Sequence, residues 1–162
     1  MISKKIILTG SFGVGKSSLF NRFIYEQFDD KYLTTIGVKV NKKSIQIGDT
    51  ELSILLWDIA GEVTQDKVPV SYFLGASGVI YVFDLSRPST YANIAKDVQY
   101  LKNLLPNGVV KIVGNKRDLI SDEQLQKITE EVPMPWNILT SAKNGENVEE
   151  LFLQMGVELL QK

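Results

Sequence analysis

The sequence predicts a three-layer α/β domain with a mostly parallel sheet and one antiparallel edge. Short apolar runs alternate with stretches of helical periodicity along the 162 residues. Two of these runs flank a tight polar turn, which indicates a hairpin. A glycine-rich segment directly follows the first run, and ligands of such sheets bind at the carboxyl ends of the strands. Without a linker or repeat in between, we expect one domain over residues 1–162.

The first half of the chain predicts three strands and one helix. The apolar run at residues 6–8 is typical of a buried strand. A helix is expected over residues 15–27, with its large apolar side chains on one face. Residues 38–47 alternate between apolar and polar, turn at residues 48–50 and return over residues 51–58. These last segments form the expected antiparallel hairpin.

The second half predicts three more helices between further strands. Helical spacing runs over residues 89–105 and stops at Pro106. Ser121 and Gln124 form a capping box that opens a short helix. Asn147, with Glu150 three residues later, opens the last helix. Strands are expected at residues 78–84, 109–113 and 136–140.

Composition excludes several functional classes. The chain has no cysteine and no histidine, so disulfides, thiolate metal sites, cysteine lipidation and histidine chemistry are excluded. Its net charge of −1 gives no electrostatic footprint for nucleic acid. The apolar runs are too short for a membrane span, and no signal peptide is visible. We therefore expect a cytoplasmic protein without an intrinsic lipid anchor.

Residues 10–18 (GSFGVGKSS) match a P-loop between a strand and a helix. Glycines let successive backbone N–H groups turn inward, and the helix N-terminus adds its positive dipole end. Lys16 supplies a charge to the outer phosphates, and the Ser17 hydroxyl suits Mg²⁺. The alternative is a glycine-rich turn followed by Lys-Ser by chance. The phosphate-binding set is Gly13, Val14, Gly15, Lys16, Ser17 and Ser18.

The sequence NKRD at residues 115–118 follows a strand and predicts guanine recognition. The carboxylate of Asp118 is an acceptor only, whereas guanine presents two adjacent donors. Adenine would leave this carboxylate unpaired. Alone, the stretch could be an ordinary charged loop. The expected base site contains Asn115, Lys116 and Asp118, with Ser141, Ala142 and Lys143 approaching from the next strand.

These stretches resemble the Ras superfamily of small GTPases, and the Rab branch most. The resemblance covers nearly the whole chain and includes TIG (35–37), WDIAG (57–61) and SAK (141–143) in the family's order. It implies a six-stranded sheet, a GTP/GDP cycle with Mg²⁺, and protein effectors and regulators of a monomer. It also places Phe28 against the guanine, which Lys116 would cover with its aliphatic stem. Plain core packing is the alternative for Phe28.

The resemblance further implies two switch segments that respond to the γ-phosphate. Thr35 would bind Mg²⁺ and the γ-phosphate, with Thr34 as the fallback. Ser17 and Asp58 complete the metal site, and Gly61 would offer its N–H to the γ-phosphate. Residues 30–37 and 59–74 are expected to be mobile with GDP and ordered with GTP. Partners would bind through residues 30–40 and 59–74.

Glu62 departs from the family, which has Gln after this glycine to orient the attacking water. A carboxylate accepts from water but cannot donate to the transition state. Glu62 either still positions water with weaker help or points to solvent without a role. The expected catalytic set is Glu62, Lys16 and Gly61, and Gln65 lies too far along to be a secure substitute.

Phe12 stands where Ras-type proteins favour a very small residue against the γ-phosphate. We expect its ring to block an arginine finger supplied by a partner. The alternative is that the ring folds onto the switches as a lid.

Trp57 and Val40 lie at positions where Rab proteins bind effectors, or they simply pack in the sheet. The chain stops near its last helix without a cysteine-bearing tail, which indicates either a natural tail-less protein or a sequence cut from a longer one.

Three functions are compatible with these motifs. The first is a slow GTPase used as a switch, with turnover near or below about 10⁻⁴ per second. The second is a scaffold that holds GTP and hydrolyses it negligibly. The third, an ATP-dependent enzyme, is disfavoured by Asp118.

Overall fold

The computed structural model describes residues 2–26, 37–62, 64–132 and 135–162. These residues form a six-stranded sheet in the order β2-β3-β1-β4-β5-β6. The β2–β3 pair is antiparallel, and the other neighbouring strands are parallel. The predicted mixed α/β sheet with one antiparallel edge is confirmed. The strands are β1 (Ile2–Gly10), β2 (Val38–Ile47), β3 (Thr50–Ile59), β4 (Ala76–Asp84), β5 (Val109–Asn115) and β6 (Ile138–Leu139).

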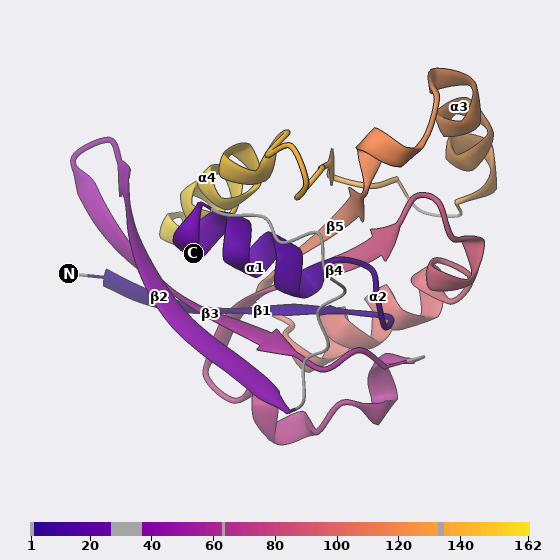
Figure 1. The fold of residues 1–162 in the computed structure, drawn as a ribbon. Helices are drawn as coiled ribbons and strands as arrows, with labels where there is room; N and C mark the ends of the chain where they lie inside the picture. The colour runs from indigo at the N-terminus through magenta and orange to yellow at the C-terminus, as the bar shows by residue number, and fades with distance from the viewer. Residues whose placement is uncertain (1, 27–36, 63, 133–134) are drawn as a thin grey trace.

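Helices cover both faces of the sheet, as Figure 1 shows. The helices are α1 (Lys16–Tyr25), α2 (Ile94–Leu104), α3 (Asp122–Glu131) and α4 (Val148–Leu160). Successive β1 residues point to opposite faces, so Ile6 and Leu8 pack with α1 and α4 while Ile7 packs with α2. Because β4 and β5 are covered on two sides, their sequences are nearly continuous apolar runs, whereas the edge strand β2 alternates between partly buried and exposed residues. The two layers of helices and the sheet between them are the three predicted layers.

Two helix starts differ from the sequence expectation. The helix expected from residue 89 begins at Ile94, after a 3₁₀ turn at Pro88–Thr90. Asn147 does precede α4, but its φ of 59° is left-handed and its side chain caps no helical N–H. Instead, the Asn147 amide donates to the Leu139 carbonyl at 2.9 Å. The capping box of α3 is confirmed, with both the Ser121 and the Gln124 hydrogen bonds present.

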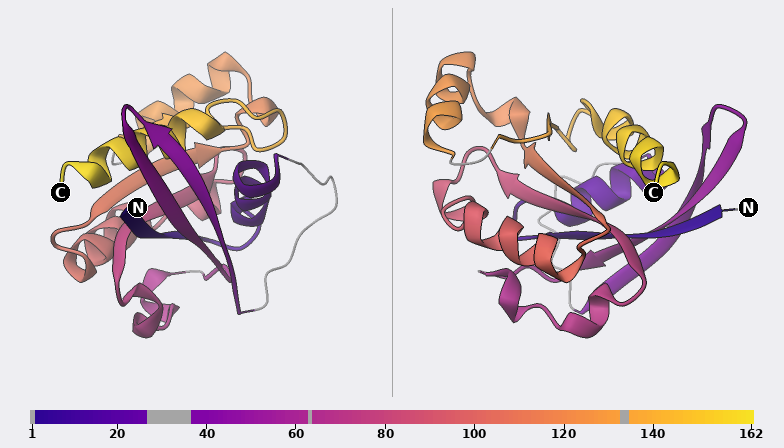
Figure 2. Two further views of the ribbon diagram at one scale, coloured as in Figure 1. Left: turned by 90° about the vertical axis from the view of Figure 1, so that its left-hand side faces the viewer. Right: turned by 180° about the vertical axis from the view of Figure 1, so that it is seen from behind.

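The outer strands differ in length. The β2–β3 hairpin pairs Ile47 with Thr50 across a tight turn and extends past the body of the molecule (Figure 2). At the other edge, β6 contains two residues, whereas a strand was expected over residues 136–140. In the part of the chain that the structure describes, no helix has the length and hydropathy needed to cross a bilayer.

Strand register brings the predicted motifs to one end of the sheet. Gly10 lies opposite Val82, Leu8 opposite Asp58, and Asp84 opposite Asn115. Since these strands are parallel, their carboxyl ends meet at this end. The phosphate loop, Asp58 and the NKRD sequence therefore lie on neighbouring strand ends.

Candidate nucleotide-binding site

The P-loop follows β1 and leads into α1. Gly15, just before the helix, has a φ of 102°. A Cβ at this position would lie 2.2 Å from Nδ2 of Asn115, so the close approach of the NKRD loop requires glycine. At this short distance, the Asn115 amide donates a hydrogen bond to the Val14 carbonyl at 3.0 Å. The phosphate loop and the base-recognition loop are thus joined directly.

Lys16 lies folded into the loop and is almost completely buried. Its ammonium donates to the carbonyls of Ser11 at 2.7 Å and Gly10 at 3.3 Å. Burial lowers the pKa of Lys16 to about 8, although the negative charge of Asp58 acts in the opposite direction. Burial therefore disfavours the charged form of Lys16, and phosphate oxygens bound beside it would stabilise that form.

Ser17 and Asp58 meet beside this lysine. The Ser17 hydroxyl donates to Oδ2 of Asp58 at 2.6 Å, and Asp58 is fully buried at the end of β3. A hydroxyl and a carboxylate oxygen are hard donors of the kind that Mg²⁺ prefers. Their chemistry and spacing fit the predicted metal site. Within the described residues, no cluster of three or more acidic side chains offers another cation site.

The guanine-recognition residues converge as expected. Asp118 is exposed, and its carboxylate accepts from the Ser141 hydroxyl at 2.7 Å. Oδ1 of Asn115 accepts from the Ala142 N–H at 3.2 Å and from the Thr140 hydroxyl at 2.9 Å. These bonds hold the two base loops together and leave Asp118 at the surface for a ligand. Lys143 is also exposed on the second loop.

Asp84 is a buried residue of the site that the sequence analysis missed. It ends β4, and its carboxylate lies 3.0 Å from the Lys116 ammonium. The same ammonium donates to the Gly13 carbonyl at 2.9 Å. Lys116 thereby connects the NKRD loop, Asp84 and the phosphate loop. The available signal was an acidic residue at the end of an otherwise apolar strand.

Gly61 and Glu62 pack against the P-loop. The Glu62 N–H donates to the Gly10 carbonyl at 3.2 Å. A Cβ on Gly61 would lie 2.5 Å from Cα of Phe12, so only glycine allows this contact. These contacts place Gly61 and Glu62 next to the P-loop, which contains Lys16. The three predicted catalytic residues therefore lie in adjacent segments. Phe12 is 53% exposed within the described residues.

A second missed feature is a buried polar network behind Gln65. The Thr9 hydroxyl donates to the Gln65 amide oxygen. The Gln65 N–H and the Tyr81 hydroxyl each donate to the Asp97 carboxylate at 3.0 Å. Burial raises the pKa of Asp97, although both of these hydrogen bonds favour the ionised form. The network ties the segment after Glu62 to α2 and to the strand that enters the P-loop.

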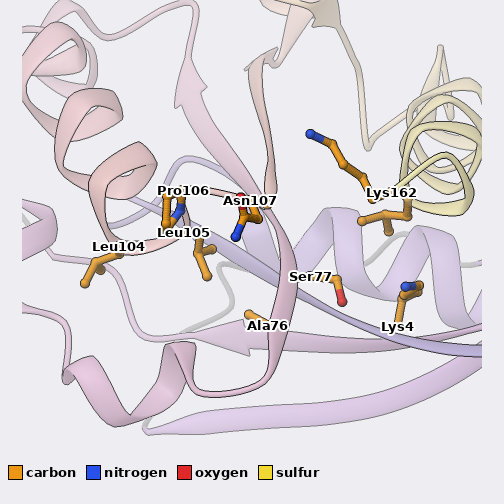
Figure 3. A pocket seen from close by; sticks show the side chains of 10 residues that line it. Lys4, Ala76, Ser77, Leu104, Leu105, Pro106, Asn107 and Lys162 are labelled. Atoms are coloured by element: carbon orange, nitrogen blue, oxygen red, sulfur yellow. The ribbon is translucent and has the colours of Figure 1, made fainter.

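Some predicted contacts fall outside the described residues, namely those of Phe28, Thr34 and Thr35. A separate hollow lies at the amino ends of β1 and β4, beside the ends of α2 and α4 (Figure 3). Lys4, Ser77, Leu105, Asn107 and Lys162 are among the residues that line it. Because the P-loop is at the carboxyl ends of these strands, this hollow is not part of the nucleotide site.

Comparison with known proteins agrees with this geometry. The family model described as "Ras family" matches residues 5–161. The chain belongs to the Ras family. It is 32% identical to the Ras-related protein SEC4 of Saccharomyces cerevisiae over 98% of this chain and 75% of that protein. It is 34% identical to the Ras-related protein Rab-1D of Dictyostelium discoideum over 96% of this chain and 78% of that protein.

Membership of the Ras family, with Rab relatives, makes this chain a GTP-binding molecular switch of the GTPase class. Ras-family proteins in general bind GTP or GDP with Mg²⁺ and use protein effectors and regulators. The predicted Rab-like resemblance is confirmed.

Proposed function

We propose that residues 1–162 form one domain that binds Mg·GTP and hydrolyses GTP slowly. The supporting observation is the convergence of three groups at one end of the sheet. These are the buried Lys16 ammonium in the P-loop, the Ser17–Asp58 oxygen pair and the exposed Asp118 carboxylate. Their chemistry suits phosphates, Mg²⁺ and guanine in that order.

Each part of the nucleotide has a proposed partner. Backbone N–H groups of residues 13–18 and the Lys16 ammonium bind the phosphates. Ser17 and Thr35 hold Mg²⁺, with Asp58 supporting it through water, and the bound ion neutralises phosphate charge. Asn115, Lys116 and Asp118 bind the base with Ser141, Ala142 and Lys143, and Phe28 packs against it.

Hydrolysis would transfer the γ-phosphoryl group to water. Water attacks the γ-phosphorus, the bond to the β–γ bridging oxygen breaks, and GDP and inorganic phosphate are released. The Lys16 ammonium and the Gly61 N–H stabilise the phosphate charge. Glu62 accepts a hydrogen bond from the water but donates none, so its help is weaker than that of an amide.

Phe12 is the second cause of the proposed slow hydrolysis, beside Glu62. Its backbone contacts Gly61, and its ring is more than half exposed at the mouth of the loop. A ring in that place obstructs an arginine from a partner protein. Since such an arginine contributes on the order of 10³–10⁵ in rate, its exclusion leaves the chain near its unassisted rate.

A single-turnover assay tests this proposal. Protein loaded with Mg²⁺ and GTP is followed by chromatography of GDP and phosphate for a day, beside Glu62→Gln and Phe12→Gly. We expect wild-type turnover at or below about 10⁻⁴ per second and a faster Glu62→Gln variant. Lys102→Ala, on the exposed side of α2, is the matched control. Wild-type turnover tenfold above that scale would refute slow hydrolysis.

The same assay tests the alternative function, a module that holds GTP without hydrolysing it. Phe12 and Glu62 favour this alternative because both weaken hydrolysis without removing a proposed nucleotide contact. Intact GTP in the wild type, with hydrolysis restored by a substitution, would establish it.

We propose that partners bind beside the hairpin and the segment after Gly61. Val40 lies opposite Trp57 in the β2–β3 ladder and is exposed. Trp57 also lies near Tyr72, with ring centroids 6.3 Å apart, and under the Lys5 ammonium. Lys5 donates to the carbonyl of the exposed Leu74 at 2.8 Å. An apolar surface with this cation at its edge suits a protein partner, and Val40→Asp should weaken such binding.

A further inference from the structure

Side-chain donors bind five successive carbonyls of the P-loop, those of residues 10–14. Lys16 donates to the carbonyls of residues 10 and 11, and Lys116 and Asn115 donate to those of residues 13 and 14. The remaining carbonyl, that of Phe12, accepts from Nη1 of Arg87 at 3.2 Å. Lys16, Lys116 and Asn115 belong to the predicted motifs, whereas Arg87 comes from the loop after β4 and belongs to none of them.

The buried carboxylate of Asp84 orients Arg87 for this contact. Nη1 of Arg87 lies 3.8 Å from Oδ2 of Asp84, which is fully buried three residues earlier. The same carboxylate holds Lys116 at 3.0 Å. One anion therefore supports the two cations that bind the adjacent carbonyls of Phe12 and Gly13.

A cation on a peptide carbonyl acts on the N–H of the same peptide. The Phe12 carbonyl and the Gly13 N–H belong to one planar trans unit and point in opposite directions. A side chain that binds the carbonyl therefore holds the plane of this peptide and fixes the direction of its N–H. The charge also polarises the peptide and makes that N–H a stronger donor. Lys116 acts in the same way on the Val14 N–H through the Gly13 carbonyl.

We propose that Arg87 is a positioning residue for nucleotide retention, acting through the peptide between Phe12 and Gly13. It aims the Gly13 N–H at the outer phosphates and never touches the nucleotide itself. This inference rests on the proposed nucleotide site, but it does not depend on the rate of hydrolysis. It gives GDP and GTP an extra interaction that GMP, which lacks the outer phosphates, does not receive.

Nucleotide binding by Arg87→Ala tests the proposal, with Arg87→Lys as the conservative variant and Lys102→Ala as the control. Loss of one charge-assisted hydrogen bond should weaken GDP binding and speed GDP release by about five- to tenfold. Affinity for GMP, measured by competition, should stay unchanged, and Arg87→Lys should recover most of the GDP affinity. An unchanged thermal midpoint would separate this effect from unfolding.

Amide NMR of the GDP complex gives a second readout. In Arg87→Ala the Gly13 amide proton should shift upfield because its donor is weaker, while the Val14 amide, supported by Lys116, stays in place. Equal GDP affinity in Arg87→Ala and Lys102→Ala would overturn the proposal, and so would equal losses for GDP and GMP. A wild type that binds GDP but does not hydrolyse GTP would refute only the slow GTPase, whereas one that binds no guanine nucleotide would refute both proposals.

Discussion

Raising the pH above 8 should weaken nucleotide binding through Lys16. Burial lowers the pKa of this ammonium from 10.5 to about 8. Phosphate oxygens against Lys16 favour its charged form and should restore a pKa near the usual value. Above pH 8, nucleotide binding must therefore take up a proton, and the observed affinity must fall as the pH rises.

The magnitude follows from the two pKa values. Free protein has about a tenth of Lys16 deprotonated at pH 7 and about nine tenths at pH 9. Between pH 7 and pH 9, the proton uptake on GDP binding should rise from about 0.1 to about 0.9 protons per protein. GDP affinity should fall about tenfold over the same interval. Folding has the opposite dependence, because the unfolded chain binds more protons than the folded nucleotide-free chain between pH 8 and 10.5. The free energy of unfolding should thus rise with pH by up to about 3 kcal/mol.

Isothermal titration calorimetry of stripped protein in two buffers of different ionisation enthalpy measures the proton uptake. The N–H of guanine and the terminal phosphate of GDP also titrate, so Lys16→Met supplies the baseline at each pH. We expect the difference between wild type and Lys16→Met to grow between pH 7 and 9. A difference that stays flat over this range would refute the argument from Lys16.

Three further predictions concern the site and its support. Gly61→Ala places a Cβ 2.5 Å from Cα of Phe12, so it should block closure of this segment onto the P-loop and slow single-turnover hydrolysis, while leaving GDP affinity within about threefold. Asp97→Ala removes the acceptor of a buried N–H and a buried hydroxyl and should lower the free energy of unfolding, measured in urea, by about 2–4 kcal/mol. Asp118→Ala should lower the preference for GDP over ADP, measured by competition, by a factor of 100 or more, on the order expected for a polar recognition site. Unchanged values in these assays would contradict the corresponding roles.

Local patterns predicted the fold and the order of the site because the relevant signals lie within a few residues. Residues 38–47 alternate in polarity and turn into residues 51–58, and the two segments form the predicted hairpin. Residues 10–17 combine a strand end, glycines and a helix start, and they form the P-loop. Such signals need no knowledge of distant partners.

The missed residues depend on contacts between distant parts of the chain. Asp84 and Lys116 are separated by 32 positions, and only the β4–β5 register brings them together. Asp97 lies on the apolar face of α2 between Ile94 and Leu101, where its carboxylate meets the Gln65 N–H from another segment. A charged residue in an apolar helical stripe was the one available sign of this network. Its partners could not be identified from spacing.

The buried network also bears on whether Gln65 could replace Glu62 as the residue that meets the attacking water. Gln65 is fully buried, its amide oxygen accepts from Thr9, and its N–H is held by Asp97. To reach the phosphates, this side chain would have to leave its buried position and give up the hydrogen bond from the Thr9 hydroxyl. Glu62 lies outside this network, and its backbone N–H donates to the Gly10 carbonyl at 3.2 Å, next to the P-loop. Gln65 is therefore an anchor for the segment in this conformation, and under the proposed function the residue left to meet the water is Glu62, a carboxylate where an amide would serve better.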